Sequence, residues 1–283
     1  MVVIRIVSDT STLYSVEEAK EAGFEVSPLL VTIGGNSYKE FEEINAQKFL
    51  DLISKGNIPT SSQPAIGDVI DAYDSEVSNE VLNITMADGL SGTYNSAVAA
   101  SKMCNNDKIT VINSKTLCGP HKFMVENAVK MAKNGEKLDS IVEKTQKIIG
   151  TAKSYLIPAD FAYLRRGGRI SPVVGYVGQV SKFAPIMTQT DDGTKLIVAG
   201  VKRNFTHAIN YIVHILEGKC TNNGTDWNMY VSHAGVKEKA EKAKAALAEK
   251  FPNALIEILE LSPAFITQGG PGCVAVQVVK TNV

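Results

Sequence analysis

The sequence predicts an α/β fold divided into two domains. Short apolar segments typical of strands alternate with amphipathic segments typical of helices through the first half, which favours a parallel sheet flanked by helices. The second half contains the pattern of a hairpin, which indicates mixed or antiparallel pairing. A length of 283 residues is sufficient for two cores. We therefore expect an N-terminal domain over residues 1–150 and a C-terminal domain over residues 151–283.

The first strand and helix are marked by local signals. An apolar run over residues 4–7 predicts a strand. Ser15 and Glu18 match a capping box, in which the two residues satisfy each other's free backbone amides, so a short helix should begin there. Gly23 is suited to end that helix. Residues 24–33 follow as an extended segment despite an internal proline.

The next helix and two further strands continue the alternation. Ile44 and Phe49 are spaced as a hydrophobic staple at the start of a helix over residues 46–54. Apolar runs at 81–86 and 108–113 predict two strands, each followed by a helical pattern. Ligands of such sheets bind beyond the carboxyl ends of the strands, where the glycine turn after the first of these runs would lie.

Two amphipathic helices close the first half. The first should begin at Pro120 and end near Gly135, because proline is favoured in the first turn and glycine at the end. The second covers about residues 138–149 and ends at Gly150. The pattern changes there, which places the domain boundary near residue 150.

The second half mixes hairpin and crossover connections. The turn sequence Asp-Asp-Gly-Thr at 191–194 lies between apolar runs at 185–188 and 195–198, which is typical of a hairpin. The remaining patterns predict helices over 206–216 and 236–250 and strands over 227–232, 254–261 and 273–280.

Composition narrows the function classes. Hydrophobic residues make up 44% of the chain and charged residues 21%, as in a globular protein. The net charge of −1 gives no general attraction to nucleic acid or to anionic membranes, and no basic recognition helix is present. We therefore expect no nucleic-acid partner and at most peripheral membrane contact.

The termini and cysteines indicate a cytoplasmic protein without a metal site. The first residues lack the basic start and long apolar core of a signal peptide. No apolar stretch approaches the roughly 20 residues of a membrane-spanning helix. The four cysteines are widely spaced and not clustered with histidine, so neither zinc nor a disulfide framework is indicated.

Residues 88–97 form the most informative junction. A strand pattern leads through a glycine turn into a helix, and the free amides at a helix N-terminus bind anions. The hydroxyls of Ser91 and Thr93 would add to this receptor. The alternative is that these two residues only cap the helix, although capping and anion binding can share one site.

Three other segments have unusual compositions. Residues 59–64, Pro-Thr-Ser-Ser-Gln-Pro, form a hydroxyl-rich loop that serves either as a turn or as a second set of donors. Residues 164–172 combine three arginines with two glycines, as in a solvated basic turn ahead of a helix or in a phosphate or protein-docking patch. Residues 267–272 are glycine-rich. They form either a simple turn or a segment that brings the backbone and Gln268 close to a ligand.

Together these segments resemble the successive signatures of the DegV family. The resemblance rests on residues 61–64, 90–94, 164–171 and 270–272, in the family's order and at suitable spacing. The opening Ser-Asp-Thr-Ser at 8–11, the Asp192-Gly193 pair and the Lys202-Arg203 pair agree with it. The resemblance covers the whole chain, and the ordered combination is more specific than any single motif.

The resemblance implies a two-domain α/β protein that holds a long-chain fatty acid between its domains. Such proteins are similar to the fatty-acid-binding subunit of bacterial fatty acid kinase, which presents the acid to a separate dihydroxyacetone-kinase-like subunit that uses ATP. The N-terminal domain would supply the head-group loops, and the C-terminal domain would complete the lipid tunnel. On this reading the protein serves phospholipid metabolism, has no catalytic activity of its own and needs no cofactor.

The resemblance also implies site residues. The carboxylate would be held by the hydroxyls of Ser61 and Ser91, with the amides near Gly92 and Thr93, and the neighbouring residues Ser62 and Gln268 belong to the same set. Arg169 and Arg203 lie in the family's arginine-bearing segments and are assigned to acyl-phosphate stabilisation or kinase docking. The apolar residues of 173–186 and 263–266 are candidates for the tunnel wall.

The sequence departs from the family pattern at two places. The family usually has a histidine where Gln268 stands, and an amide donates a hydrogen bond without the positive charge of an imidazolium. Small hydroxyl residues are usual where Ala87 and Asp88 stand. A carboxylate at Asp88 that pointed into the site would repel a fatty-acid anion, so we expect it to point away or the ligand to differ.

Two alternatives remain. Ser91 could be the nucleophile of an acyl hydrolase, although position 93 is threonine where the G-x-S-x-G motif has glycine, and a histidine base would be required. The four histidines lie in patterns that suit helix surfaces or strand ends. The second alternative is a lipid carrier without a kinase partner. The chain is not itself a P-loop kinase, because it has no G-x-x-x-x-G-K-[ST] segment.

Overall fold

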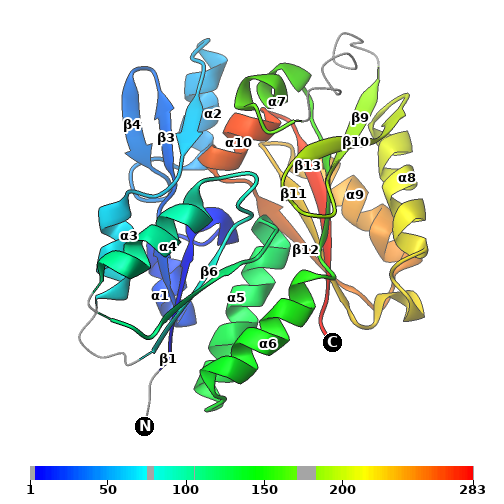
Figure 1. Ribbon diagram of the computed structural model, residues 1–283. Coiled ribbons are helices and arrows are strands. Elements are labelled where there is room, and N and C mark those ends of the chain that lie inside the picture. The colour runs from blue at the N-terminus through cyan, green and yellow to red at the C-terminus, as the bar shows by residue number, and fades with distance from the viewer. Residues whose placement is uncertain (1–3, 75–79, 105, 171–182, 283) are drawn as a thin grey trace.

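The computed structural model describes residues 4–74, 80–104, 106–170 and 183–282. Three sheets organise this part of the chain, with helices packed on the two larger ones (Figure 1). The predicted α/β class is confirmed. Among the helices of the described residues, none is long and apolar enough to cross a membrane.

The first sheet is parallel, with the order β2-β1-β6-β7. Its strands are β1 (Ile4–Asp9), β2 (Glu25–Ser27), β6 (Glu80–Thr85) and β7 (Ile109–Asn113). Alternate residues of each strand face opposite sides. Ile6 and Leu82 therefore pack in a different hydrophobic cluster from Val7 and Val81.

Helices cover both faces of this sheet, as predicted. The cluster around Ile6 involves α1 (Val16–Ala22), α5 (Cys118–Lys133) and α6 (Leu138–Ile149), whereas the cluster around Val7 involves α3 (Ile66–Tyr73) and α4 (Thr93–Met103). The capping box of Ser15 and Glu18 is present, and Gly23 ends α1 in the left-handed conformation. The sequence analysis did not predict α3.

The second sheet is small and antiparallel, with the order β4-β3-β5. Its strands are β3 (Leu30–Ile33), β4 (Asn36–Lys39) and β5 (Thr60–Ser62), and α2 (Ala46–Ser54) packs beside it. The extended segment 24–33 is thus two strands in different sheets, separated at Pro28, which has no amide hydrogen to pair. The predicted loop at 59–64 is wrong over Thr60–Ser62, because β5 pairs with β3.

The third sheet has six strands in the order β10-β9-β8-β13-β11-β12. They are β8 (Lys153–Ile157), β9 (Ala184–Gln189), β10 (Leu196–Lys202), β11 (Trp227–His233), β12 (Leu255–Glu260) and β13 (Val274–Lys280). The β9–β10 hairpin is present, and only β11 and β12 pair in parallel. Helices α8 (Phe205–Glu217) and α9 (Lys237–Lys250) pack against one face, and α5 approaches the other.

Two short helices were not predicted, and both belong to the site. Helix α7 (Phe161–Gly167) includes the start of the arginine–glycine segment, so the basic turn predicted there is helical over residues 164–167. Helix α10 (Pro263–Gly269) includes the start of the glycine-rich segment 267–272. Each has only seven residues, too few for a helical period to be recognised. Figure 1 shows α10 between the small sheet and the six-stranded sheet.

Candidate functional site

An apolar cavity of about 760 Å³ lies beside the six-stranded sheet. Strands β8, β9 and β13 line it, together with the start of α5 and helix α10. Its apolar lining includes Met86, Leu90, Leu117, Cys118, Leu156, Leu164, Met187, Leu196, Leu261, Phe265, Cys273 and Ala275. A concave and mostly apolar lining suits a small-molecule ligand.

A second cavity of about 330 Å³ adjoins the first. The two cavities share the lining residues Met86, Leu90, Arg169, Phe265 and Gln268. The second cavity adds Leu29, Ser61, Ser62, Ser91 and Ala264. An apolar chamber therefore lies next to a small chamber with hydroxyl, amide and guanidinium groups.

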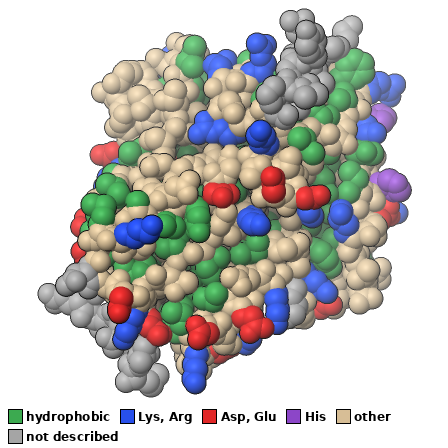
Figure 2. All heavy atoms as spheres, in the orientation of Figure 1, with side chains coloured by type: hydrophobic (Ala, Val, Ile, Leu, Met, Phe, Trp, Pro, Cys, Tyr) green, Lys and Arg blue, Asp and Glu red, His purple; other side chains and the backbone are tan. Residues whose placement is uncertain are grey.

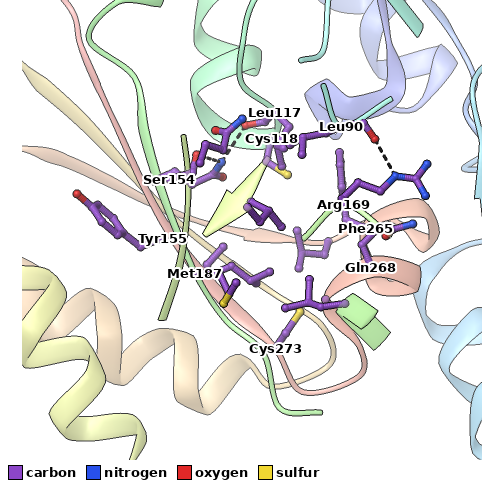
Figure 3. A pocket seen from close by; sticks show the side chains of 18 of the residues that line it. Leu90, Leu117, Cys118, Ser154, Tyr155, Arg169, Met187, Phe265, Gln268 and Cys273 are labelled. Atoms are coloured by element: carbon purple, nitrogen blue, oxygen red, sulfur yellow. Dashed lines mark hydrogen bonds between the residues drawn. The ribbon is translucent and has the colours of Figure 1, made fainter. Parts of the chain in front are cut away.

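The predicted residues that meet in this small chamber come from distant parts of the chain. Ser61 and Ser62 lie on β5, Ser91 precedes α4, Arg169 follows α7 and Gln268 lies on α10. Figure 3 shows Arg169 and Gln268 on one side of the apolar cavity, with Ser154 and Tyr155 on the other side. The polar groups are thus gathered at one end.

The Gln268 side chain links α10 to the small sheet. Its Nε2 atom donates a hydrogen bond to Ser61 Oγ at 3.1 Å. Its Oε1 atom is buried and meets no hydrogen-bond donor in the described part of the chain, so it has spare acceptor capacity. A Cβ atom at Gly167 would lie 1.9 Å from this Oε1, so only glycine leaves room for the amide.

The glycine turn is built in a similar way. A Cβ atom at Gly92 would lie 1.9 Å from Gln63 Oε1, so the Thr-Ser-Ser-Gln-Pro segment is seated against the turn. Gly92 is the N-cap of α4, and no side chain caps the helix. The alternative in which Ser91 or Thr93 caps the helix from the N-cap position is therefore wrong.

The Ser91 hydroxyl is held by its neighbour. Ser91 Oγ lies 2.8 Å from Thr93 Oγ1, and the Thr93 amide donates to Ser91 Oγ at 3.3 Å. Thr93 is 3% exposed and lines neither cavity within the described residues. The structure thus places Ser91 at the cavity surface and Thr93 behind it.

The two predicted arginines lie in different surroundings. The Nε atom of Arg169 donates to the carbonyl of Leu90 at 3.1 Å, and its guanidinium also donates to the carbonyl of Gly167. These contacts hold the cation at the junction of the two cavities. Arg203 is exposed in the turn between β10 and α8, and among the described lining residues it belongs to neither cavity.

A basic surface adjoins the site. Arg165 and Arg166, at the end of α7, are exposed, and the Arg166 guanidinium lies 4.3 Å from the centre of the Tyr163 ring. Figure 2 shows Lys and Arg side chains gathered in the upper middle of this face, over the region where α7 and α10 lie in Figure 1.

The histidines do not support a hydrolase site at Ser91. His121 is fully buried in the first turns of α5, so its prediction as a surface residue is wrong. Its Nε2 atom lies 2.9 Å from the carbonyl of Ile84 and must donate there, so Nδ1 accepts from Ser11 Oγ at 2.7 Å. Over the ranges that the structure describes, the hydroxyl of Ser91 has no histidine partner.

The cavity lining is electrically neutral over most of its surface. Burial raises the pKa of the Cys273 thiol to about 12 and that of Cys118 well above its ordinary value, so both thiols stay protonated at neutral pH. The described residues contain no cluster of three His, Cys, Asp or Glu side chains that could hold a metal ion. A neutral, apolar chamber is suited to a hydrocarbon chain.

Sequence reasoning found the polar end of the site better than its wall. Ala264 and Phe265 of the candidate segment 263–266 do line the cavities. Of the other candidate segment, 173–186, residues 173–182 lie outside the described residues, and Ile186 faces the cluster against α8. Met187, Cys273 and Gln277 were missed, although the two-residue alternation of β13 could have indicated which of its side chains share a face.

The chain is similar to known proteins over almost its whole length. The family model for the DegV family matches residues 3–281. A DegV domain-containing protein from Listeria monocytogenes is 30% identical over 273 residues, which is 95% of each chain. These matches agree with the resemblance carried by the sequence motifs.

Solved structures show the same fold. The crystal structure of DegV from Bacillus subtilis, described as a fatty acid binding protein, has a TM-score of 0.87 at 25% identity and covers 99% of this chain and 100% of that one. The structure of a DegV family protein from Thermus thermophilus, described by its fatty acid binding, has a TM-score of 0.89 at 22% identity. It covers 98% of this chain and 99% of that one. Family model, relatives and fold agree over almost the whole length, and the chain belongs to the DegV family.

Proposed function

We propose that this protein binds a long-chain fatty acid, with the hydrocarbon tail in the apolar cavity and the carboxyl group in the adjoining polar chamber. The observation that carries the proposal is that the apolar cavity and the polar chamber lie side by side and share five lining residues. The relatives from Bacillus subtilis and Thermus thermophilus, which are described as fatty-acid-binding, support it. The domain boundary is placed near residue 150. Residues 1–150 would supply the head-group loops, and residues 151–283 would supply the floor of the tunnel.

Burial of the tail would supply most of the affinity. Each methylene transferred from water contributes about 0.8 kcal/mol, so a long acyl chain needs only a few head-group contacts to fix its direction. Those contacts are concentrated at one end of the cavity. The tail would therefore enter the chamber lined by Leu156 and Met187, away from the polar groups.

The polar chamber offers donors for a carboxylate. Ser61 Oγ accepts a hydrogen bond from Gln268, which leaves the Ser61 hydroxyl hydrogen free to donate to the ligand. Ser91 likewise accepts from the Thr93 amide. Arg169, held between two carbonyl groups, adds positive charge to the same chamber. Gln268 acts here as a neutral partner, so the charge in the chamber comes from the arginine.

The carboxyl group would then be presented to a separate, ATP-dependent kinase subunit in the cytoplasm for acyl-phosphate formation. On this proposal the protein is a substrate-presenting subunit and not an enzyme. The exposed arginines at the end of α7 are placed to meet a partner or its nucleotide phosphates. Arg203 is assigned to docking and Arg169 to the charge of the acyl phosphate.

The direct test is to denature the purified protein, extract it with organic solvent and identify the released lipid by mass spectrometry. Release of a long-chain fatty acid, or uptake of one by delipidated protein, is expected. Absence of both would end the proposal. The kinase role is tested by adding the dihydroxyacetone-kinase-like subunit of the same organism with ATP. Binding without phosphorylation would indicate a carrier without a kinase partner.

The hydrolase alternative is tested with the same preparation. Release of acid from acyl esters by the protein alone, abolished in Ser91→Ala, would indicate an enzyme. We expect no such release, because the described partners of the Ser91 hydroxyl include no base.

A further inference from the structure

The floor of the apolar cavity follows the alternation of β13. Cys273, Ala275 and Gln277 face the cavity, whereas the intervening residues belong to the cluster against α8 and α9, namely Val274, Val276 and Val278. Because Gln277 is on the cavity face, a polar side chain follows Cys273 and Ala275 on the cavity side of this segment. This position was not among the residues that the motifs singled out.

The change from apolar to polar occurs between two cross-strand rows. Strand pairing places Ala275 opposite Leu156 of β8, and Leu156 opposite Met187 of β9. The next row on the same face places Gln277 opposite Ser154. Two residues along a strand span about 7 Å, so the hydrocarbon-lined floor ends one step after Ala275.

Gln277 is rigid and its amide is already satisfied. The side chain is 1% exposed. Its Nε2 atom donates to the Leu117 carbonyl and to Ser154 Oγ, each at 2.9 Å, and the Gly119 amide donates to its Oε1 at 3.4 Å. A buried amide with all these partners has no need of a ligand and resists displacement.

The start of α5 closes the space next to Gln277. A Cβ atom at Gly119 would lie 2.0 Å from Cγ of Tyr230, so the helix backbone is in contact with the ring on β11. Tyr230 belongs to a separate buried cluster with Met124 and Val279. The cavity floor therefore meets packed protein at Gln277, whereas Ser154 and Gln189 also line a neighbouring polar pocket.

This row lies opposite the polar chamber. Figure 3 shows Ser154 across the cavity from Arg169 and Gln268. A fatty acid whose carboxyl group is held at Ser61 and Ser91 would therefore direct its methyl end toward Gln277. An apolar methyl group gains nothing from an amide whose hydrogen bonds are already made.

We infer that Gln277 and Ser154 form the end wall of the acyl channel and set the upper limit on the length of the fatty acid tail. The inference rests on the proposed function and names its specificity-determining residues. Affinity should rise with each added methylene until the tail reaches this row. A longer tail must leave methylenes outside the channel or displace Gln277, which would strand the Leu117 carbonyl and the Gly119 amide.

The test is a competition among acids of different length. Delipidated protein is offered an equimolar mixture of lauric, myristic, palmitic, stearic and arachidic acids. The bound acids are then extracted, and the amount of each is measured by mass spectrometry. Ala275→Leu fills space one row before the wall without breaking a hydrogen bond of Gln277. Gln277→Ala removes the wall. The matched control is Val276→Ala, on the same strand but facing the α8 and α9 cluster.

Ala275→Leu and Gln277→Ala should shift the preferred length of the bound acid in opposite directions. Ala275→Leu should favour shorter acids, with affinity for the longest bound acid falling about fourfold for each methylene that no longer fits. Gln277→Ala should admit longer acids than the wild type. Val276→Ala should keep the wild-type length profile even where it lowers thermal stability.

Separate outcomes overturn the two proposals. A wild-type length profile in Ala275→Leu protein that still carries lipid would place the tail elsewhere and overturn the end wall. If Gln277→Ala fails to fold by circular dichroism, Ser154→Leu replaces it, and an unchanged profile there would likewise overturn the inference. A wild-type protein that takes up none of the acids would refute the proposed function itself.

Discussion

The carboxylate of Glu40 accepts a hydrogen bond from the backbone amide of Ala264 at 3.0 Å, although the two residues are 224 positions apart in the sequence. The Thr10 hydroxyl donates to its other oxygen at 2.5 Å. Glu40 is fully buried, and Ala264 lies in the first turn of α10. This carboxyl group therefore fixes the helix that carries Phe265 and Gln268 against the N-terminal half.

The buried Glu40 should make stability depend on pH. Burial raises its pKa to about 7, so the folded protein holds a proton that the unfolded chain, with an ordinary value of 4.5, releases. The stability from this group is fully present below pH 4.5 and is lost as pH rises through about 7. In thermal melts Glu40→Gln should remove this slope, of at most about 1.4 kcal/mol per pH unit.

The buried His121 contributes to the pH dependence of stability with the opposite sign, so its contribution must be separated from that of Glu40. Burial lowers its pKa, so its contribution to stability is lost as pH falls through its ordinary value of 6.5. The difference between wild type and Glu40→Gln cancels this contribution. A difference that is flat with pH would contradict the assignment to Glu40.

Removal of one head-group hydroxyl should weaken binding without unfolding the protein. Ser61→Ala deletes the acceptor of the Gln268 amide and a proposed donor to the carboxylate. A hydrogen bond to a charged group contributes about 1.5 to 3 kcal/mol, so the Kd for a fatty acid should rise at least about tenfold. Titration calorimetry measures it. Ser37→Ala, an exposed hydroxyl on β4, is the control and should leave the Kd unchanged.

The contact between α5 and the six-stranded sheet should be intolerant of a single methyl group. In Gly119→Ala the new Cβ meets the Tyr230 ring, and such overpacking typically costs about 1 to 3 kcal/mol. Gly67→Ala is the matched control, because a Cβ atom on that residue of α3 meets nothing within 4 Å. Chemical denaturation should show Gly119→Ala destabilised and Gly67→Ala unchanged or slightly more stable.

Substitution of the two arginines should distinguish fatty-acid binding from phosphorylation of the bound acid. Arg169 lines both cavities, so Arg169→Ala should reduce fatty-acid affinity and acyl-phosphate formation together. Arg203 is exposed away from them, so Arg203→Ala should spare binding and reduce only the ATP-dependent step. Lys242→Ala on α9 removes an exposed cation as a control. Equal loss of binding and phosphorylation in Arg203→Ala would refute this division.

Signals that act over a few residues determined much of the fold in advance. The capping box at Ser15, the hairpin about Asp192-Gly193 and the alternation of strands with helices all appear in the structure. Each depends on backbone amides or side chains within a short segment, so the sequence displays it directly. The short helices α7 and α10 were not predicted, because seven residues are too few to show a repeating helical pattern of apolar residues.

The sequence by itself determined the family motifs, and with them most of the polar residues that line the small chamber. Only the tertiary structure decided that Gln268 donates to Ser61, 207 positions away, that Thr93 lies behind Ser91, and that Gln277 lines the cavity beside Ser154. These contacts depend on how the small sheet, α10 and the six-stranded sheet pack together. Such packing brings together side chains that no local pattern relates, so it is absent from any short stretch of sequence.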